Sequence, residues 1–193
     1  MVEANLDFNI GCVNPSGIAT TIYAVSKKDI AGWPTISDDI TNDETTAAQA
    51  AKYSGSFSLK TGKKFRKLYS TQGKGKANFE QLGERDSKMF KNKFIMSYPD
   101  LTPEGLAFCK EVCNGDCVII VKSAGRYHVI GNPNYRTETT STSGDTGDEA
   151  GSSKGIKLEA ECPDTTPLPL YEGNITTDDG TLNCSTGEFT PAS

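Results

Sequence analysis

The sequence predicts a mainly β fold: an antiparallel β-sandwich or barrel with one flanking α-helix, an extended N-terminal arm and long loops. Short segments rich in β-branched and aromatic residues recur along the chain and are separated by glycine turns. Only one segment carries both the start and the stop signals of a helix. The 19 Gly, 9 Pro and 21 Thr among 193 residues also favour turns and strands. Leu, Ile, Val and Phe make up 37 residues, about 19%, so we expect a thin core.

The length fits one domain. Residues 18–175 are expected to form a single β-rich unit, preceded by an N-terminal arm at 1–17 and followed by a polar C-terminal tail at 176–193, with one short strand near Ile175. Residues 137–154 contain no aliphatic side chain larger than alanine. Such a segment buries too little apolar surface to fold alone, so we expect a mobile loop there.

The first strand is predicted at 18–25, where β-branched and aromatic residues dominate. An acidic loop at 29–46 follows around Trp33, and the alanines of 43–52 predict a short helix. Glycine turns then separate a meander of four predicted strands, at 56–60, 64–71, 76–81 and 87–99. In the last of these, one face is apolar and the other is basic.

The helix is predicted at 102–114. Thr102 is a good N-cap, Pro103 suits the first helical position, and Asn114-Gly115 predicts a left-handed stop. Its expected apolar stripe consists of Leu106, Cys109, Val112 and Cys113.

The segment after the helix is expected to form the centre of the core. Residues 117–123 are apolar on both faces and predict a central strand, which turns at Ala124-Gly125 into a second strand at 126–131. A further strand is predicted at 155–162.

The net charge of −5 hides a segregation of charges along the chain. Residues 60–93 hold eleven Lys or Arg against three acids, whereas 138–193 hold eleven acids against two Lys. Residues 29–44 hold five acids and no base.

Three interpretations of these blocks stay open. They are solvated faces, complementary surfaces on neighbouring copies of the chain, or a nucleic-acid site, which the alternating aromatics disfavour because they offer no stacking platform. If copies associate, the candidate inter-subunit contacts are Lys63, Lys64, Arg66, Lys67, Lys74, Lys76, Lys91, Lys93, Asp38, Asp39, Asp43, Glu44 and Trp33.

The sequence gives little support to catalysis. His128 is the only histidine, and no nucleophile motif surrounds it. Cys109, Cys113 and Cys117 are interpreted mainly as buried small hydrophobes, with a disulfide or a metal site as alternatives. We expect no enzyme activity, cofactor or bound metal. No apolar run approaches the roughly 20 residues of a membrane span, so no membrane partner is expected.

The assembled pattern resembles tail tube proteins of phages and prophages of the Bacteroides group. The resemblance covers roughly residues 17–175. The residues that carry it are Gly55-x-Phe57, Lys64-Phe65-x-Lys67-x-Tyr69, the Lys91-Asn92-Lys93 stretch that ends in Tyr98-Pro99, and Val118 to Gly131 followed by Asn132-Pro133.

The resemblance implies a non-enzymatic virion subunit, assembled in the bacterial host cytoplasm. Such subunits form hexameric rings that stack into a tube, bind other tail or neck proteins, and contact DNA only as passing cargo. The 137–154 segment and the tail have no counterpart in the resemblance, so a neck or tail-end ring, or a capsid decoration protein, stays open. The rival from another class is a monomeric carbohydrate-binding module that uses Trp33, Tyr127 and Tyr135.

Overall fold

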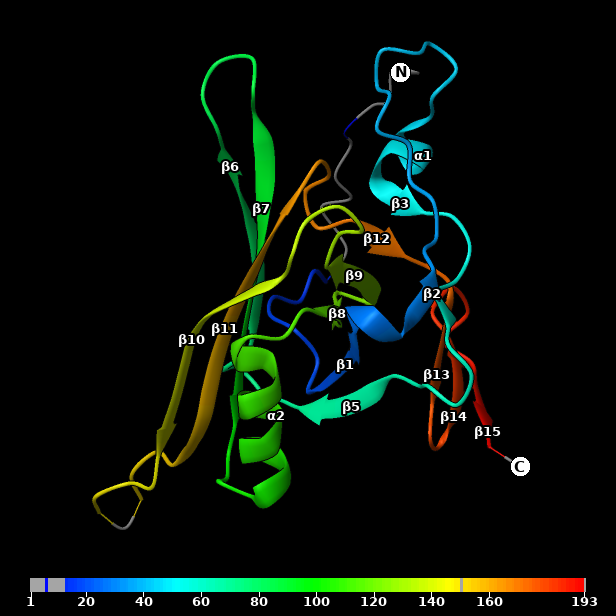
Figure 1. The fold of residues 1–193 in the computed structure, drawn as a ribbon. Coiled ribbons are helices and arrows are strands. Elements are labelled where there is room, and N and C mark those ends of the chain that lie inside the picture. The colour runs from blue at the N-terminus through cyan, green and yellow to red at the C-terminus, as the bar shows by residue number, and fades with distance from the viewer. Residues whose placement is uncertain (1–5, 7–12, 150, 193) are drawn as a thin grey trace.

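A computed structural model describes residue 6, residues 13–149 and residues 151–192. The protein is mainly β, and its two larger sheets pack face to face as a sandwich (Figure 1). Within the described residues, no helix is long and apolar enough to cross a membrane.

The central layer is a six-stranded sheet in the order β3-β12-β9-β8-β1-β5, antiparallel except between β12 and β3. Val118 to Val121 of β8 are buried on both faces of the sheet, which confirms the predicted central strand. β8 turns into β9 at Ala124 and Gly125, whose φ angles of 47° and 83° are those of a tight hairpin turn. The strand bounds are β1 Thr21–Ser26, β3 Lys52–Tyr53, β5 Arg66–Tyr69, β8 Cys117–Ser123, β9 Arg126–Ile130 and β12 Leu170–Tyr171.

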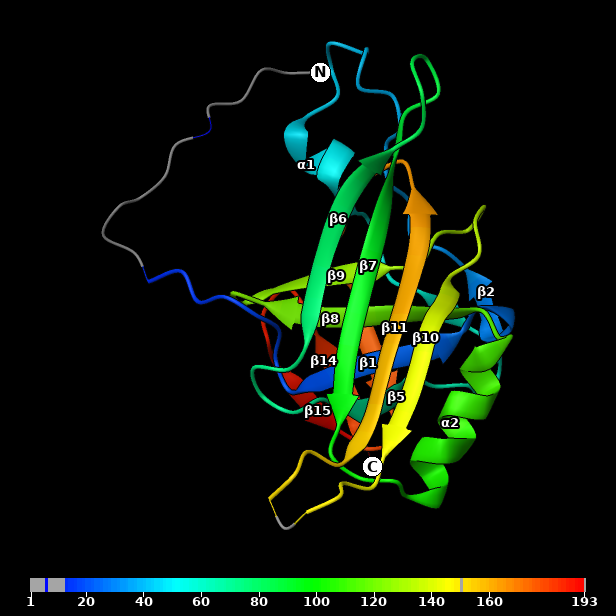
Figure 2. The ribbon, with the colours of Figure 1, turned by 90° about the vertical axis from the view of Figure 1, so that its left-hand side faces the viewer.

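A four-stranded antiparallel sheet covers one face of the central layer, in the order β10-β11-β7-β6. Its long strands run across those of the central sheet (Figure 2). Phe94, Met96 and Leu158 point into the apolar cluster between the two sheets, where they meet Ile22 and Ile119. The bounds are β6 Lys76–Leu82, β7 Met89–Tyr98, β10 Glu138–Asp145 and β11 Gly155–Asp164.

The other face of the central sheet is covered by the C-terminal segment together with the chain between β1 and β5. Ile175, Leu182 and Cys184 lie in a second apolar cluster beside Phe57 and Tyr171. The elements on this side are the 3-10 helix Lys27–Asp29, β2 Ile30–Gly32, α1 Ala47–Ala51, β4 Ser58–Leu59, β13 Asn174–Thr177, β14 Gly180–Asn183 and β15 Phe189–Pro191.

Two predictions about segment ends are therefore wrong. Residues 176–193 are not a polar tail, because they form most of β13 together with β14 and β15, and they place Leu182 and Cys184 in the core. Residues 137–154 are not a loop throughout, because 138–145 form β10. The pairing with β11 supplies backbone hydrogen bonds that do not depend on apolar side chains.

The predicted meander is also wrong in its connections. β5 pairs with β1 in the central sheet, whereas β6 pairs with β7 in the other sheet. The chain changes sheets between two neighbouring residues: the Ser70 N–H donates to the Thr20 carbonyl, and the Thr71 N–H donates to the Ser97 carbonyl.

The helix α2, Pro103–Cys113, is confirmed with its cap. The Thr102 hydroxyl oxygen accepts a hydrogen bond from the Gly105 N–H at 3.2 Å. The predicted left-handed stop is wrong, since Asn114 has a φ of −124°. Gly115 is required instead for close packing, because a Cβ there would lie 2.4 Å from the Glu111 carbonyl oxygen.

The predicted stripe of α2 is only partly right. Val112 is buried, but Leu106 is 51% exposed and Cys113 is exposed. The helix instead turns Gly105 toward the four-stranded sheet, where the absence of a side chain allows close contact with Tyr98 and Ile156.

Candidate assembly surfaces

The outer face of the four-stranded sheet is polar and largely neutral. Its side chains alternate with the core residues of the same strands, and Figure 2 views this face directly. The Glu161 carboxylate beside Lys91 raises the pKa of that amine, and the hydrogen bond from Lys93 lowers the pKa of Glu80. Three ion pairs with N–O distances of 2.7–2.8 Å join strand residues of this sheet: Lys91–Glu161, Lys93–Glu80 and Lys157–Glu159.

Both sides of this sheet end in an unpaired strand within the described part of the chain. β6 forms one edge and β10 forms the other. β10 is Thr- and Ser-rich and contains neither Lys nor Pro, the residues that usually protect an edge from pairing. The threonines were the available sequence signal for this strand, because Thr favours strands even where no apolar face exists.

In the first part of the basic block, residues 60–76, four of the seven Lys and Arg residues pair with acids of the same chain. Arg66 forms a two-pronged ion pair with Glu111 of α2, with N–O distances of 2.7 and 2.8 Å. These hydrogen bonds lower the pKa of Glu111 and raise that of Arg66. The other pairs are Lys63–Asp29 at 3.5 Å, Lys64–Asp178 at 3.2 Å and Lys67–Asp179 at 2.6 Å. The charge blocks are therefore segregated along the sequence but largely paired in space.

Two further candidate bases, Lys74 and Lys76, lie near the start of β6. Lys74 donates to the Ser153 hydroxyl at 3.1 Å, and Lys76 is exposed at the first position of that edge strand.

The four acidic candidates lie in the exposed loop before α1. Asp39 accepts hydrogen bonds from the N–H and the hydroxyl of Thr41, which lower its pKa. Asp38 accepts from the Thr165 hydroxyl at 2.6 Å, while Asp43 and Glu44 are exposed. This loop and the tip of the β6–β7 hairpin project at one end of the molecule, and the β10–β11 turn projects at the other (Figure 1).

The aromatic residues proposed for carbohydrate binding do not form a platform. Trp33 is partly buried and packs edge-on against Phe57, with ring centroids 5.2 Å apart. Tyr127 is 5% exposed in the same apolar cluster, whereas Tyr135 is 40% exposed. Two of the three rings therefore serve the core.

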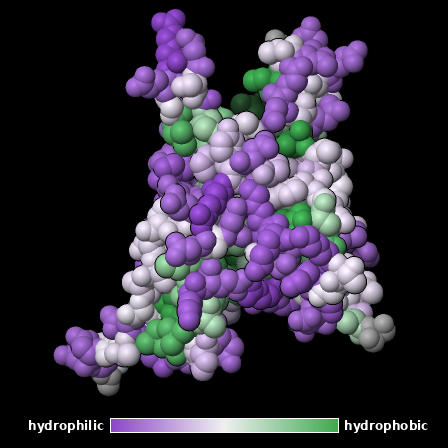
Figure 3. Space-filling view, viewed as in Figure 1, coloured by the Kyte–Doolittle hydropathy of each residue, from purple (hydrophilic) through white to green (hydrophobic). Residues whose placement is uncertain are grey.

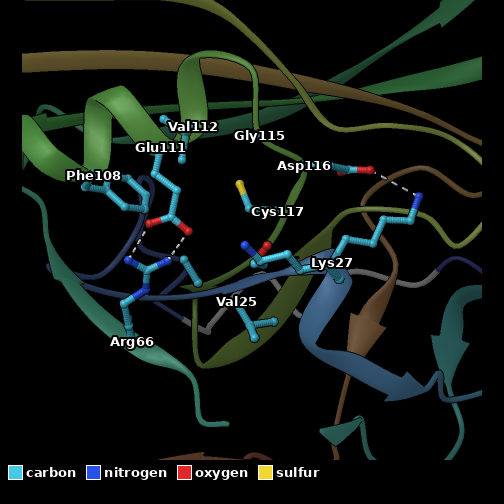
Figure 4. A pocket seen from close by; sticks show the side chains of 12 residues that line it. Val25, Lys27, Arg66, Phe108, Glu111, Val112, Gly115, Asp116 and Cys117 are labelled. Atoms are coloured by element: carbon cyan, nitrogen blue, oxygen red, sulfur yellow. Dashed lines mark hydrogen bonds and ion pairs between the residues drawn. The ribbon is translucent and has the colours of Figure 1, made fainter. Parts of the chain in front are cut away.

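A hollow of about 360 Å³ lies between β1 and the C-terminal end of α2 (Figure 4). Arg66 and Glu111 line one side of it, Lys27 and Asp116 line the other, and each basic side chain pairs with its acid. Cys117 lies between them, and burial raises the pKa of its thiol to about 12. The thiol is therefore protonated near neutral pH and is a poor nucleophile.

The other candidates for chemistry have structural partners. His128 Nδ1 donates to the Leu168 carbonyl oxygen at 2.9 Å and so does not contact a carboxylate through that atom. All five cysteines from Cys109 to Cys184 are unpaired thiols, so the structure holds no disulfide among them. Across the described residues, no group of three or more His, Cys, Asp or Glu could hold a metal ion.

Alkylation should distinguish the cysteines sharply. Cys113 is exposed, whereas Cys117, Cys162 and Cys184 are buried, with pKa values raised to about 12. We expect iodoacetamide at about pH 8 to modify Cys113 at least ~100-fold faster than these three, because the thiolate reacts and burial blocks access. Mass spectrometry of the native protein measures the rates, and the guanidinium-unfolded protein is the control. Equal native rates would contradict the structure.

Sequence reasoning missed a buried polar network that joins the layers. Asp164 is 1% exposed, and its carboxylate accepts hydrogen bonds from the side-chain amides of Asn92 and Asn132 and from the Thr166 N–H. The Asn92 side-chain oxygen in turn accepts from the Leu168 N–H at 2.8 Å. This network fixes the connection between β11 and β12.

Comparison with known proteins gives no relative. No family model, curated protein or solved structure matches the chain. The basis for assigning a function is therefore the set of surfaces described above, together with the resemblance carried by the sequence.

Proposed function

We propose that this protein is a structural subunit of a phage virion. Copies assemble into rings, hexameric in the family that the sequence resembles, and the rings stack into a tail tube through which DNA passes. A neck or tail-end ring would use the same contacts between copies.

The free edges of the four-stranded sheet carry this proposal. β6 and β10 lie on opposite sides of one sheet, and they contain seven and eight residues. The β6 edge of one copy can therefore pair with the β10 edge of the next. Such a head-to-tail contact closes into a ring when the rotation between copies allows it.

The charges of this sheet suit a surface that faces passing DNA. Lys91 and Lys93 are paired with glutamates of neighbouring strands and Lys157 with Glu159 of its own strand, so most of its lysines are not free to bind phosphates. A face with many unpaired bases would retain DNA, whereas a neutral polar face lets it move.

The ends of the molecule offer contacts between stacked rings. The acidic loop before α1 and the β6–β7 tip project at one end, and the β10–β11 turn projects at the other (Figure 1). The rival interpretation as a monomeric carbohydrate binder is weaker, because Trp33 and Tyr127 pack inside the molecule.

Electron microscopy and sedimentation velocity of the purified protein test the proposal. At high protein concentration and low salt we expect rings or tubes. A strictly monomeric particle under these conditions would overturn it.

Proline variants of β10 test the edge itself. Thr142→Pro and Ser143→Pro change neighbouring residues, whose N–H groups point to opposite sides of the strand. One of the two variants loses an N–H group that points away from β11. This variant should keep the thermal stability of the monomer, because proline is tolerated on the unpaired side of an edge strand. It should nevertheless assemble only at an at least tenfold higher protein concentration, since losing a hydrogen bond of about 1 kcal/mol at each interface adds to the steric block.

The other proline variant is the matched control. It removes a hydrogen bond to β11 and should lower the melting temperature of the monomer. If the variant with unchanged melting temperature assembled like the wild type, β10 would not be the contact edge.

A further inference from the structure

The N-terminal sequence has the residue pattern of a strand. Residues 2–10 read VEANLDFNI, in which apolar and polar residues alternate without exception. This period of two is typical of a strand with one buried face. Leu6 is the one residue of this stretch that the structure describes, and its side chain is fully exposed.

The central sheet has a free edge at β5. The Ser70 N–H points toward β1, where it donates to the Thr20 carbonyl. Because N–H groups alternate along a strand, those of Lys67 and Tyr69 point away from β1. No strand pairs with that side of β5 among the residues that the structure describes.

The open stretch of this edge is short and has defined ends. The Phe65 N–H donates to the Thr176 carbonyl at 2.8 Å, and the Thr71 N–H donates to the Ser97 carbonyl at 2.7 Å. An added strand can therefore pair between these two bonds, opposite Lys67 and Tyr69. That window suits a segment of about five residues.

A groove accompanies the free edge. A first hollow, of about 260 Å³, lies between β5 and α2 and is lined by the apolar groups of Leu68, Phe108 and Met96. A second hollow, of about 530 Å³, is lined by residues of β5, by Ala107 and other residues of α2, and by Asp178 and Asp179 of the β13–β14 turn. An apolar area also lies over α2 on the molecular surface (Figure 3).

We propose that the arm of a second copy, residues 2–10, adds as a strand to the β5 edge in this groove. Its apolar face, centred on Leu6 and Phe8, lies against α2 and Leu68. Its polar face carries Glu3 and Asp7, and Lys67 on the neighbouring face of β5 is already paired with Asp179, so the apolar face and the backbone hydrogen bonds would hold the arm. Strand addition of this kind takes its affinity from backbone hydrogen bonds and its specificity from alternate side chains.

The arm of a second copy fits the β5 edge better than the arm of the same chain. Residues 13–17 are all exposed, and they leave the body on the side away from α2 (Figure 2). The β6, β10 and β5 edges would then give each copy separate sites for ring closure and for arm exchange. The inference deepens the self-assembly proposed above and rests on it.

Site-specific cross-linking in the full-length chain tests the arm. Phe8 is replaced by the photo-reactive benzoyl-phenylalanine, and ¹⁵N-labelled and unlabelled copies are mixed before irradiation. We expect cross-links to β5 and α2 that join one labelled and one unlabelled chain. Cross-links only within one chain, or only to other elements, would overturn the proposal.

Two pairs of matched variants test the groove beside β5 and the alternating pattern of residues 2–10. Ala107→Arg fills the groove and should reduce cross-linking at least about tenfold, whereas Cys113→Arg places the same side chain on α2 outside the groove and should not. Leu6→Asp should likewise abolish cross-linking, whereas Asn5→Asp adds the same charge to the polar face and should preserve it. Equal effects within either pair would count against the proposal.

The outcomes separate the two proposals. Rings whose cross-links map away from β5 would reject the arm contact and leave the virion subunit intact. Arm cross-links between copies that never form rings would reject the ring and leave the arm contact intact.

Discussion

A chain that stops after Glu172 is expected to lose its cooperative fold. The deletion removes β13 to β15 and exposes the cluster around Phe57 and Tyr171. Burial of a large apolar side chain contributes about 1.5–3 kcal/mol. Ile175 and Leu182 alone therefore contribute several kcal/mol, a large part of the 5–15 kcal/mol that typically holds a domain together.

Backbone contacts add to this loss. The Thr176 carbonyl accepts a hydrogen bond from the Phe65 N–H. The Tyr171 hydroxyl also donates to the Asn174 carbonyl at 2.8 Å. Without the C-terminal segment these groups lose their partners, and buried unpaired groups are costly.

Trp33 reports on this prediction, because it is the only tryptophan and packs against the same cluster. Its fluorescence during urea unfolding should show a cooperative transition for the wild type and none for the truncated chain. A chain that stops after Glu188 is the matched control. It loses only β15, whose residues are exposed, and should keep its stability within about 1 kcal/mol.

The point variant Ile175→Ala should still fold and therefore give a measurable change in the free energy of unfolding. It should lower the free energy of unfolding by about 3 kcal/mol, because the side chain is fully buried. If residues 176–193 were a polar tail, the two truncated chains would behave alike.

The parts of the fold that could be predicted are those with strong local signals. The apolar run of β8 indicates burial on both faces, and Thr102 with Pro103 marks the start of α2. Each signal depends only on neighbouring residues, so the prediction does not require knowledge of how the rest of the chain folds.

The parts that were missed depend on partners far along the chain. β10 is a rim strand with polar side chains on both faces, so it shows no period of two. β13 and β14 contribute few apolar side chains, and these become core residues only because the central sheet lies beside them. Alternation indicates the face of a residue but not the strand it pairs with, which is why β5 and β6 were placed in one meander.

The candidate contacts illustrate the same limit. The basic block and the acidic blocks could be found from the sequence, but not their pairing, since Arg66 and Glu111 are 45 residues apart. The structure pairs most of these charges within one copy, so the proposed assembly would depend on the free strand edges and not on the charges.

Replacement of Asp164 by Ala is the second large effect that we expect. It should lower the free energy of unfolding by about 3 kcal/mol, because the amides of Asn92 and Asn132 and the Thr166 N–H lose their buried acceptor. Urea unfolding measures the change. Asp178→Ala removes a carboxylate that is 91% exposed and paired only with Lys64, so it should change stability by at most about 0.5 kcal/mol.

The contribution of Asp164 to the free energy of unfolding depends on pH, and the shift of its pKa sets the direction. Burial raises the pKa of Asp164 above its usual value of 3.8, despite the hydrogen bonds that favour the carboxylate. The folded state therefore prefers the protonated group. Its contribution to stability is fully present below the unfolded pKa and is lost as pH rises through the higher pKa of the folded state.

Asp164→Asn isolates this contribution, since the variant keeps the shape of the side chain but cannot ionise. The free energy of unfolding of the wild type minus that of the variant should fall as pH rises from about 3 to about 7. Other carboxylates titrate in both proteins and cancel in the difference. A difference that rises with pH would mean that the native state favours the charged form, and hydrogen bonding rather than burial would then dominate at this site.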